Sequence, residues 1–420
     1  MIAETWDVVV IGAGAAGLLA AIRAAELGRR TLLLEKNKKP GVKILMSGGT
    51  RCNLTHATDN RGIVEAFGPA GKFLHSPLAA LSVADTIALF ENEGVATKAE
   101  DTGKVFPVSN KAADVLDALL RRLHRSGAIL SLAEPVTRVA PTRGGAWTLT
   151  TPQRTIAARR VIVTSGGKSY PGSGTTGDGY GFCAQFGHTI IPPRPSLTPI
   201  RVTVPWITDL RGVTIPGVQL RVLEADGKLV ASHPAVRRGS LLFAHFGLSG
   251  PVALDVSRVI SGHPSPRSLR LELDLLLGDS EAELGDFLRS ESLASGKKQL
   301  AVVLASRLPR RLCDALLRQA GMAPERKAAA LSKAERTILV AAMKRLTLPV
   351  AGTLGFEKAE VTAGGVALDE VDSRTMRSKL VPELYIAGEV LDLDGPIGGY
   401  NFQSAFSTGW LAGTHAAESA

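Results

Sequence analysis

The fold of this chain is decided by residues 6–17, which read WDVVVIGAGAAG. A run of apolar residues, typical of a buried strand, ends in three closely spaced glycines. An apolar segment with helical composition follows at 18–27, and a second strand is predicted at 30–34. This order of strand, glycine turn, helix and strand is a βαβ unit that predicts dinucleotide binding, with the diphosphate at the N-terminus of the helix.

Each residue of this turn has an expected role. Gly12 permits the tight turn, Gly14 lets the backbone approach a pyrophosphate, and Gly17 lets the helix pack closely on the strand. Glu35 ends the second strand, where a carboxylate can bind the hydroxyl groups of a ribose. The cofactor-binding residues expected from this unit are Gly12, Gly14, Ala15, Ala16, Gly17, Glu35 and Lys36.

Length and composition indicate a globular protein of several domains. A chain of 420 residues exceeds the size at which one hydrophobic core stops growing, which favours two or three domains. Hydrophobic residues make up 45% and charged residues 21%, as is ordinary for a soluble protein. Aromatic residues make up only 5%, which argues against a surface that stacks nucleic-acid bases.

The net charge of +10 fits an RNA partner, a membrane surface or an acidic ligand such as a cofactor diphosphate. The acidic ligand is favoured, because the basic residues are scattered as pairs without a long basic tract or interleaved aromatic residues. We therefore expect a small-molecule substrate, with no nucleic acid favoured as a partner.

The three cysteines, Cys52, Cys183 and Cys313, lie far apart and form neither a CxxC dithiol nor a metal-ligand spacing. We therefore expect no metal and a reduced, cytoplasmic location. The apolar run at 8–22 is preceded by Glu4 and Asp7, is interrupted by glycines and is too short to span a bilayer. We expect neither a targeting segment nor a membrane span.

Residues 37–56 read as a long glycine-rich loop. Its serine, glycines, arginine and asparagine supply donors and bare amides that would surround a second part of an extended cofactor, although loops of this composition are also common at plain solvated surfaces. Cys52 has no partner cysteine nearby and is interpreted as a small packing residue. The candidate binding residues in this loop are Ser47, Gly48, Gly49, Arg51, Cys52 and Asn53.

A buried strand, predicted at 161–163, ends at Gly166 and Gly167. It resembles the strand followed by Ala-Thr-Gly in flavoproteins with two dinucleotide-binding domains, with Thr164 and Ser165 in place of Ala and Thr. A turn-rich loop at 169–180 then leads into a predicted helix at 181–186. The candidate binding residues here are Ser165, Gly166 and Gly167, together with Val136 of a strand expected at 135–139.

Four prolines between 192 and 199 mark a domain boundary. Beyond them, short alternating strands between 200 and 277 predict a β-barrel, and helical spacing over 279–345 predicts a helical insert. His245 lies within the barrel segment, and a structural role at a strand end is favoured over general-acid chemistry. The expected parts are an FAD-type domain at 1–190 and 370–420, a barrel at 191–278 and 346–369, and the insert at 279–345.

The C-terminal segment carries the second strong signal. A hydrophobic strand ends at Gly388 and Glu389, and a glycine-rich turn opens a final helix that runs to Ala417. The unpaired amides at that helix start would favour the negative charge of a reduced flavin, although such a turn can also serve tight packing alone. The candidate binding residues are Gly388, Glu389, Gly399, Tyr400 and Asn401.

Together, the glycine turn, 47–53, 106–112, 169–180, 362–366 and 388–403 resemble the BaiN/YhiN-like (aminoacetone-oxidase-like) bacterial FAD-binding flavoproteins. Thr50 departs from the pattern, because the family usually has a further glycine there. The resemblance covers nearly the whole chain. It implies an α/β fold with a discontinuous Rossmann-like FAD domain of the two-dinucleotide-binding type, an inserted β-barrel domain for the substrate and a small helical subdomain.

The expected function is that of an FAD-dependent oxidoreductase. It would transfer a hydride between flavin N5 and a small organic substrate held between the FAD and barrel domains, with the FAD bound non-covalently. NAD(P)H is a possible electron donor, although no clear second GxGxxG supports it. The alternatives are an FAD-dependent RNA-modifying enzyme and a flavin-binding protein without substrate chemistry. No Ser-His-Asp or paired-carboxylate constellation assigns a catalytic residue.

Overall fold

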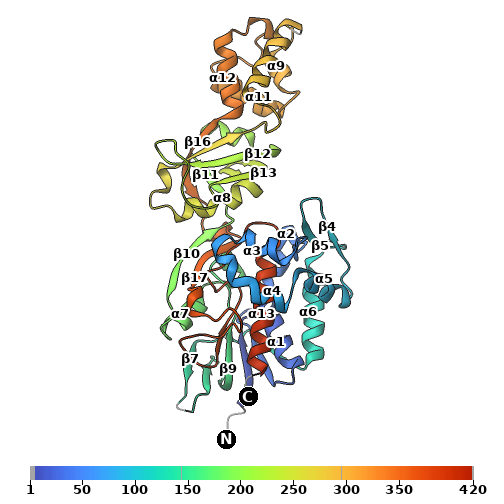
Figure 1. Ribbon diagram of the computed structural model, residues 1–420, viewed down its shortest axis with the longest axis vertical. Coiled ribbons are helices and arrows are strands. Elements are labelled where there is room, and N and C mark those ends of the chain that lie inside the picture. The colour runs from blue at the N-terminus through green and yellow to red at the C-terminus, as the bar shows by residue number, and fades with distance from the viewer. Residues whose placement is uncertain (1–4, 143, 295, 419–420) are drawn as a thin grey trace. The chain divides into compact units, whose positions relative to one another are not determined.

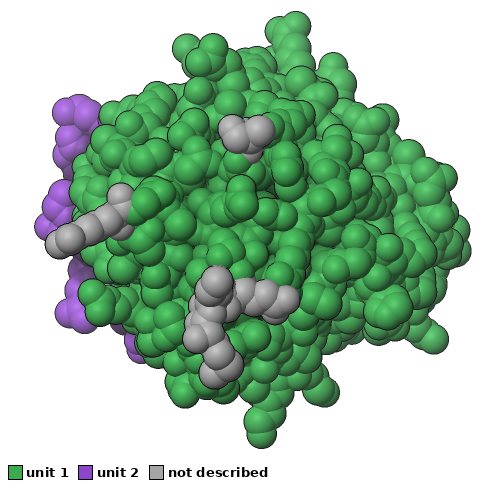
Figure 2. Space-filling model, turned by 90° about the horizontal axis from the view of Figure 1, so that it is seen from below, with its two compact units in different colours: residues 1–194, 360–420 green, residues 195–359 purple. Residues whose placement is uncertain are grey.

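The computed structural model describes residues 5–142, 144–294 and 296–418. The chain forms two compact units, coloured separately in Figure 2. Unit 1 comprises residues 1–194 and 360–420, and unit 2 comprises residues 195–359. Taken singly, no helix in the described part of the chain is long and apolar enough to cross a membrane. Residues 68–80 and 83–92 reach that length only as a pair bent by 43°.

Unit 1 is built on a seven-stranded sheet. Its central strand, β1, pairs in parallel with β2 on one side and β9 on the other, so that Val9 lies between Leu32 and Val161. These strands are runs of Val, Leu and Ile because both of their faces are buried. In order, the strands are β6 (Ile129–Ser131), β2 (Thr31–Leu34), β1 (Thr5–Ile11), β9 (Thr155–Val163), β8 (Trp147–Thr150) and β7 (Arg138–Pro141), with β18 (Leu384–Ile386) also paired to β9.

Three helices lie side by side in unit 1 (Figure 1): α13 (Tyr400–Glu418), α1 (Ala15–Glu26) and α6 (Ala112–Ser126). A Cβ added to Gly409 would lie 2.2 Å from the backbone oxygen of Ala16, and one added to Gly413 would lie 2.4 Å from that of Ala20. Glycine at these positions therefore lets α13 and α1 approach closely. Because 409 meets 16 and 413 meets 20, the two helices run parallel, and residues 400–407 of α13 extend beyond the N-terminus of α1.

The remaining elements of unit 1 surround this core. A small sheet has the order β3, β5, β4, and β10 pairs with β17. The bounds of these strands are β3 (Thr55–His56), β4 (Thr97–Ala99), β5 (Lys104–Pro107), β10 (Ile190–Ser196) and β17 (Val361–Val366). The further helices are α2 (Val42–Thr50), α3 (Asn60–Ala66), α4 (His75–Ala80), α5 (Val83–Asn92) and α7 (Asp178–Ala184).

Three local expectations differ from the structure. The amphipathic spacing of residues 75–94 predicts a helix, but this segment forms two helices, α4 and α5, because Leu81 is extended and Ser82 starts α5 in a capping box with Asp85. The helix expected at 181–186 begins earlier, as α7. The loop expected over 37–56 contains α2, which follows Gly41 in the left-handed conformation.

Unit 2 contains a closed barrel of six strands in the order β11, β14, β13, β12, β15, β16. Along β12, the side chains of Leu220 and Val222 are buried, whereas those of Gln219 and Arg221, which alternate with them, are half-buried. This alternation is the one that a barrel with an apolar interior requires. The strands are β11 (Ile200–Val202), β12 (Thr214–Leu223), β13 (Val236–Ala244), β14 (Gly247–Ser249), β15 (Arg270–Asp274) and β16 (Leu346–Thr353).

Unit 2 also contains helices next to the barrel. A helix that the sequence did not predict, α8 (Pro251–Gly262), packs against β12 and β13. Between β15 and β16 the chain forms four helices that gather at one end of the barrel (Figure 1): α9 (Glu281–Ala294), α10 (Leu300–Leu304), α11 (Arg310–Gln319) and α12 (Lys333–Lys344).

The expected second part of the barrel, 346–369, is divided in the structure. β16 closes the barrel, but β17 pairs with β10, and the chain re-enters unit 1 at Glu360. The reason is a close backbone approach: a Cβ on Gly364 would lie 2.5 Å from the backbone oxygen of Pro192. All six residues of β17 are buried, which an alternating barrel strand would not show.

Candidate functional site

The glycine turn of unit 1 leaves open space at one glycine and none at the other two. A Cβ on Gly12, whose φ is +102°, would lie 2.8 Å from the backbone oxygen of Thr164. A Cβ on Gly17 would lie 1.8 Å from the Gly12 oxygen, whereas nothing lies within 4 Å of one on Gly14. Helix α1 has no side-chain cap and no acidic residue in its first turn. Its first amides, at Ala15 and Ala16, are thus available to an anion.

Glu35 braces this turn. Its Oε2 accepts a hydrogen bond from the Ala13 amide at 2.8 Å, and its Oε1 accepts one from the Asn37 amide at 2.8 Å. The side chain is 8% exposed, and a carboxylate has further lone pairs with which to accept ribose hydroxyls. Lys36 lies elsewhere: its Nζ contacts Oδ2 of Asp178 at 2.6 Å and the hydroxyl of Thr176. It ties the loop before α7 to the end of β2.

The end of β9 holds the turn from the other side. The hydroxyl of Thr164 donates to the backbone oxygens of Ile11 and Gly12, at 2.9 and 3.0 Å. Sequence reasoning treated Thr164 only as a substitution within a motif and missed this role. Ser165 follows it, and Gly166 takes a φ of +74°. Gly167 has no room for a side chain, since its Cβ would lie 2.4 Å from the hydroxyl oxygen of Thr362.

Val136 precedes β7 rather than lying in it, and it packs partly buried against the core of unit 1. The segment just before it runs beside the end of β2, because the amides of Ala133 and Glu134 donate to the backbone oxygens of Asn37 and Glu35, each at 2.9 Å. Val136 therefore follows a segment that is hydrogen-bonded to the end of β2.

Residues 47–53 form the irregular end of α2. Ser47, Gly48 and Gly49 leave helical geometry, and Thr50 has a φ of +69°. A left-handed β-branched residue is unusual, so the glycine that the family usually has at this position suits the backbone better. Cys52 is fully buried, and burial raises the pKa of its thiol to about 12.

The two polar side chains of this segment differ in what they contact. The Arg51 guanidinium lies 3.9 Å from the Phe106 ring centroid and pairs with Oε1 of Glu100 at 2.7 Å, so its charge is already matched within the protein. Asn53 is 8% exposed and its Oδ1 has no partner.

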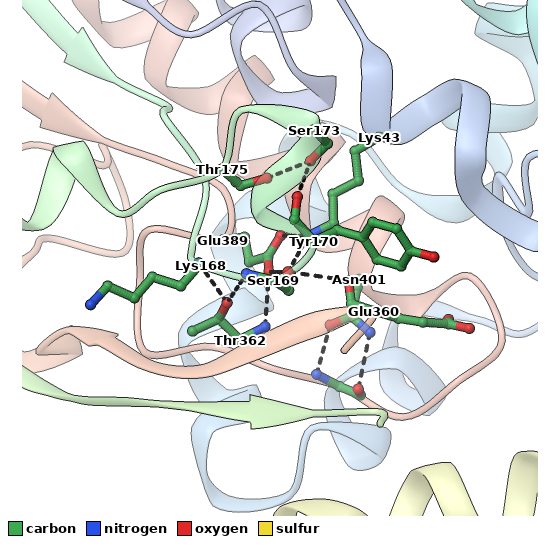
Figure 3. Close-up of polar contacts among 11 residues, drawn as sticks. Lys43, Lys168, Ser169, Tyr170, Ser173, Thr175, Glu360, Thr362, Glu389 and Asn401 are labelled. Carbon is green, nitrogen blue, oxygen red and sulfur yellow. Dashed lines mark hydrogen bonds and ion pairs between the residues drawn. The ribbon is translucent and has the colours of Figure 1, made fainter. Parts of the chain in front are cut away.

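Glu389 is the centre of a polar cluster in unit 1 (Figure 3). Its Oε2 pairs with Nζ of Lys43 at 2.5 Å, and its Oε1 accepts from the hydroxyl of Ser169 and the amide of Thr362, both at 2.8 Å. The Thr362 hydroxyl in turn accepts from the amides of Lys168 and Ser169. Four segments that are distant in sequence therefore meet at one carboxylate. The sequence analysis named Glu389 as a binding residue and placed Ser169 and Thr362 in motifs of the family resemblance, but it did not predict that they contact Glu389.

The start of α13 is fixed by short contacts. Gly388, with a φ of +78°, lies against Ala16. A Cβ on Gly399 would lie 2.3 Å from the backbone oxygen of Thr55, so this glycine is required for packing. The Tyr400 ring stacks on His56 with centroids 4.5 Å apart.

Asn401 closes the loop before α13. Its side chain accepts from the Gly395 amide at 2.8 Å and donates to the Gly395 oxygen at 3.0 Å and the Pro396 oxygen at 3.2 Å. The predicted cofactor contacts of this segment thus concern backbone amides rather than the Asn401 side chain.

The residues present fit an FAD molecule. The space at Gly14 and the uncapped start of α1 suit a diphosphate, and Glu35 at the end of β2 suits a ribose. Three buried side-chain oxygens in the surrounding segments have no hydrogen-bond partner: Asn53 Oδ1, Ser165 Oγ and Tyr180 Oη. Buried polar atoms are normally paired, so these atoms point to a missing ligand.

The histidine, cysteine and acidic side chains of the described residues provide no metal site and no reactive thiol. Within residues 5–142, 144–294 and 296–418, no group of three or more His, Cys, Asp or Glu side chains could hold a metal ion. His245 is exposed on the turn between β13 and β14 in unit 2, with its ring against Phe246. Burial raises the pKa of the Cys183 and Cys313 thiols to about 12, so both are neutral packing residues.

A mainly parallel sheet with a glycine turn, an acidic strand end and two closely packed parallel helices defines an FAD-binding flavoprotein of the oxidoreductase type. The family model described as "HI0933-like protein Rossmann domain" matches residues 6–415, and the chain belongs to this family. The resemblance inferred from the sequence and the predicted fold class are thereby confirmed.

Relatives of known name match the chain over almost its whole length. It is 35% identical to a ribosomal RNA dihydrouridine synthase of Escherichia coli, with 97% of each chain covered, and 33% identical to one of Haemophilus influenzae, with 96% covered. It is 31% identical to a 3-dehydro-bile acid delta(4,6)-reductase of Clostridium scindens, covering 97% of this chain and 98% of that protein.

Among solved structures, the 3-ketosteroid-delta4-(5alpha)-dehydrogenase of Rhodococcus jostii resembles the chain with a TM-score of 0.54, 15% identity and coverage of 99% of this chain and 97% of that one. At this identity the likeness concerns the fold alone.

Proposed function

We propose that this chain is an FAD-dependent reductase that saturates a carbon–carbon double bond conjugated with a carbonyl group, and that its substrate is a uridine within RNA. The observation that carries the proposal is the similarity, over nearly the full length, to two ribosomal RNA dihydrouridine synthases. The 5,6 double bond of uracil is conjugated with the C4 carbonyl, and a dienone is the corresponding group in a delta(4,6) bile acid. The substrates in the names of these relatives therefore share one type of reducible bond, a carbon–carbon double bond conjugated with a carbonyl group.

The charge distribution supports an RNA substrate over the small molecule expected from the sequence. Unit 2 carries 23 Lys and Arg against 15 Asp and Glu, whereas unit 1 carries 26 against 24. Nearly all of the surplus positive charge thus belongs to the unit that contains the barrel and the helices. This surplus lies in one continuous segment, 195–359, but the basic residues within it are spaced along the sequence and form no long tract. A polyanion would be attracted to such a unit.

Unit 1 would hold the cofactor. The amides at the start of α1 would bind the diphosphate, Glu35 would accept from the ribose, and the start of α13 would face the flavin ring. When bound and reduced, FAD would supply a hydride for C6 of uracil. A proton must then reach C5, and two electrons from a donor such as NAD(P)H must restore the reduced state. FAD attachment would be non-covalent, since the segments around the site present no exposed cysteine: Cys52 and Cys183 are both buried.

The test is anaerobic turnover of the holoenzyme with an excess of NAD(P)H or dithionite. The substrates are ribosomal RNA that lacks dihydrouridine, free uridine and a 3-oxo-delta(4,6) bile acid. Nucleosides from digested RNA are analysed by mass spectrometry for the gain of two hydrogen atoms. Formation of dihydrouridine in the RNA supports the proposal. Reduction of the bile acid alone would favour the second candidate, a small-molecule enone reductase. The 31% identity to the Clostridium enzyme supports this candidate. If the bound flavin is reduced but transfers electrons to none of the three substrates, both candidate functions are refuted.

A further inference from the structure

A half-buried arginine in unit 2 has hydrogen-bond donors that the protein leaves unused. Arg237 lies on β13 opposite the buried Leu220 of β12, and its side chain is 26% exposed. A guanidinium has five N–H donors. Among the described residues, its side chain makes one hydrogen bond, from Nη1 to the Val236 oxygen at 3.3 Å, and one ion pair, from Nε to Oδ2 of Asp255 at 3.8 Å. That ion pair is too long to be a hydrogen bond.

Arginines elsewhere in the protein show the contrast. Arg154 of unit 1 donates two hydrogen bonds to the Glu134 carboxylate, at 2.9 and 3.0 Å. Arg221, on the neighbouring strand of the same barrel, reaches Oε1 of Glu272 at 2.8 Å. Arg237 thus differs from both: it is half-buried, and its long ion pair with Asp255 leaves most of its donors without a hydrogen-bond acceptor.

Two further basic residues lie at this location. Arg258 and Asp255 lie one turn apart on α8, which packs against β13, and His233 precedes β13. Burial lowers the pKa of the Arg237 guanidinium; Asp255 opposes this effect and Arg258 adds to it. Burial also lowers the pKa of His233, with further lowering by Arg237 and Arg258. One carboxylate therefore faces two guanidinium groups and an imidazole.

We propose that Arg237 and Arg258, with His233 at the rim, form a binding site for a phosphodiester of the RNA substrate. An arginine fork matches two phosphate oxygens, and a phosphate would supply acceptors for the unused donors of Arg237 and negative charge beside the two guanidinium groups. The overall surplus of positive charge in unit 2 agrees with this role. The assignment rests on the proposed function, because it takes RNA to be the substrate.

The experiment measures the affinity of the FAD-loaded, full-length enzyme for a fluorescent ribosomal RNA fragment, between about 50 and 200 mM salt. Arg237→Gln and Arg258→Gln should each weaken binding about 5- to 150-fold and reduce the magnitude of the salt slope by about 0.7 for a contact with single-stranded RNA. Arg237→Lys should restore part of the affinity, because a lysine keeps the charge but loses the fork. Flavin content and the rate of flavin reduction should not change in any of these variants.

The controls separate the site from a general charge effect and from a structural role. Arg61→Gln on α3 of unit 1 removes one positive charge from an 85% exposed side chain and should leave the affinity within about two-fold. Asp255→Asn removes the competing carboxylate and should strengthen RNA binding. Thermal unfolding is followed for each variant.

The outcomes distinguish this assignment from the proposed function. If the wild type neither binds nor modifies RNA, the proposed function and the site fail together. If the wild type forms dihydrouridine and Arg237→Gln keeps its affinity and salt slope, the site alone is refuted. If Asp255→Asn lowers both the unfolding temperature and the RNA affinity, the cluster is a structural ion pair between α8 and β13, and the assignment is also overturned.

Discussion

Two glycines of the turn between β1 and α1 should respond in opposite ways to the addition of one methyl group. Gly14→Ala places the methyl group in open space, on a residue whose φ of −84° any amino acid can adopt. Gly17→Ala places it 1.8 Å from the Gly12 oxygen and 2.6 Å from the Thr164 hydroxyl. The first variant therefore tests ligand binding and the second tests packing.

The magnitudes follow from these surroundings. For Gly14→Ala, the loss of an N-cap glycine and the smaller entropy of the unfolded chain oppose each other, so the stability of the apoprotein should change by less than about 1 kcal/mol. The FAD affinity should fall by about 1.5–3 kcal/mol, the value of a hydrogen bond to a charged group, because the diphosphate can no longer approach the amides. For Gly17→Ala, overpacking against rigid backbone should cost about 3 kcal/mol or more.

Urea unfolding of the apoproteins and fluorescence titration with FAD measure the two quantities separately. The expected pattern is a stable Gly14→Ala protein that binds FAD about 10- to 150-fold more weakly, and a Gly17→Ala protein that is destabilised before any cofactor is added. If Gly14→Ala bound FAD as tightly as the wild type, the diphosphate would not lie at this turn, and the placement of the cofactor would be wrong.

Four further predictions concern the cofactor and the core. The purified protein should be yellow and release free FAD on denaturation; a flavin that stays with the denatured chain would show a covalent link. Glu35→Ala should weaken FAD binding by about 1–3 kcal/mol and also destabilise the apoprotein, because the Ala13 and Asn37 amides lose their acceptor; an unchanged flavin titration would leave Glu35 only its bracing role. Gln403→Leu should cost about 2–4 kcal/mol in urea unfolding, since the fully buried amide accepts from Thr55 and donates to Thr86 and Ser407; a neutral result would mean that water replaces it. Finally, burial raises the folded-state pKa of Cys52, Cys183 and Cys313 from 9.0 to about 12, so the unfolded chain loses these protons first as the pH rises. The free energy of unfolding should therefore fall above pH 9 by about 1.4 kcal/mol per pH unit for each thiol, and a Cys183→Ala variant should show a smaller fall. A free energy of unfolding that does not change between pH 9 and 11 would contradict the burial of these thiols.

Local chemistry made much of unit 1 predictable. Several signals of the FAD-binding unit depend only on neighbouring residues and can be read from the sequence directly. They are the glycines at 12, 14 and 17, the acidic residue at 35 and the apolar strand before 388. The same holds for the proline-rich boundary before the barrel and for the helical spacing of 279–345. The membership of unit 1 in an FAD-binding family follows from these signals, and the family match confirms it.

Other features depended on contacts between distant segments, which a single sequence does not display. Glu389 was visible as a strand-end acid, but its partners Lys43, Ser169 and Thr362 come from three other segments. β17 carries a pattern that suits several strand environments, and only the close approach of Gly364 to β10 places it in unit 1. Helix α8 was missed because its chain begins with glycine and proline, which read as a turn.

The distribution of charge also depends partly on the sequence and partly on the tertiary structure. The sequence determined the total of +10 and, through the glycine turn, where a diphosphate would bind. Tertiary structure decided that residues 195–359, which hold most of the surplus, form one unit and that Arg237, Asp255 and Arg258 meet there. The physical reason is that backbone requirements are encoded within a few neighbouring residues, whereas the field at a side chain is a sum over all the charges that folding brings near it.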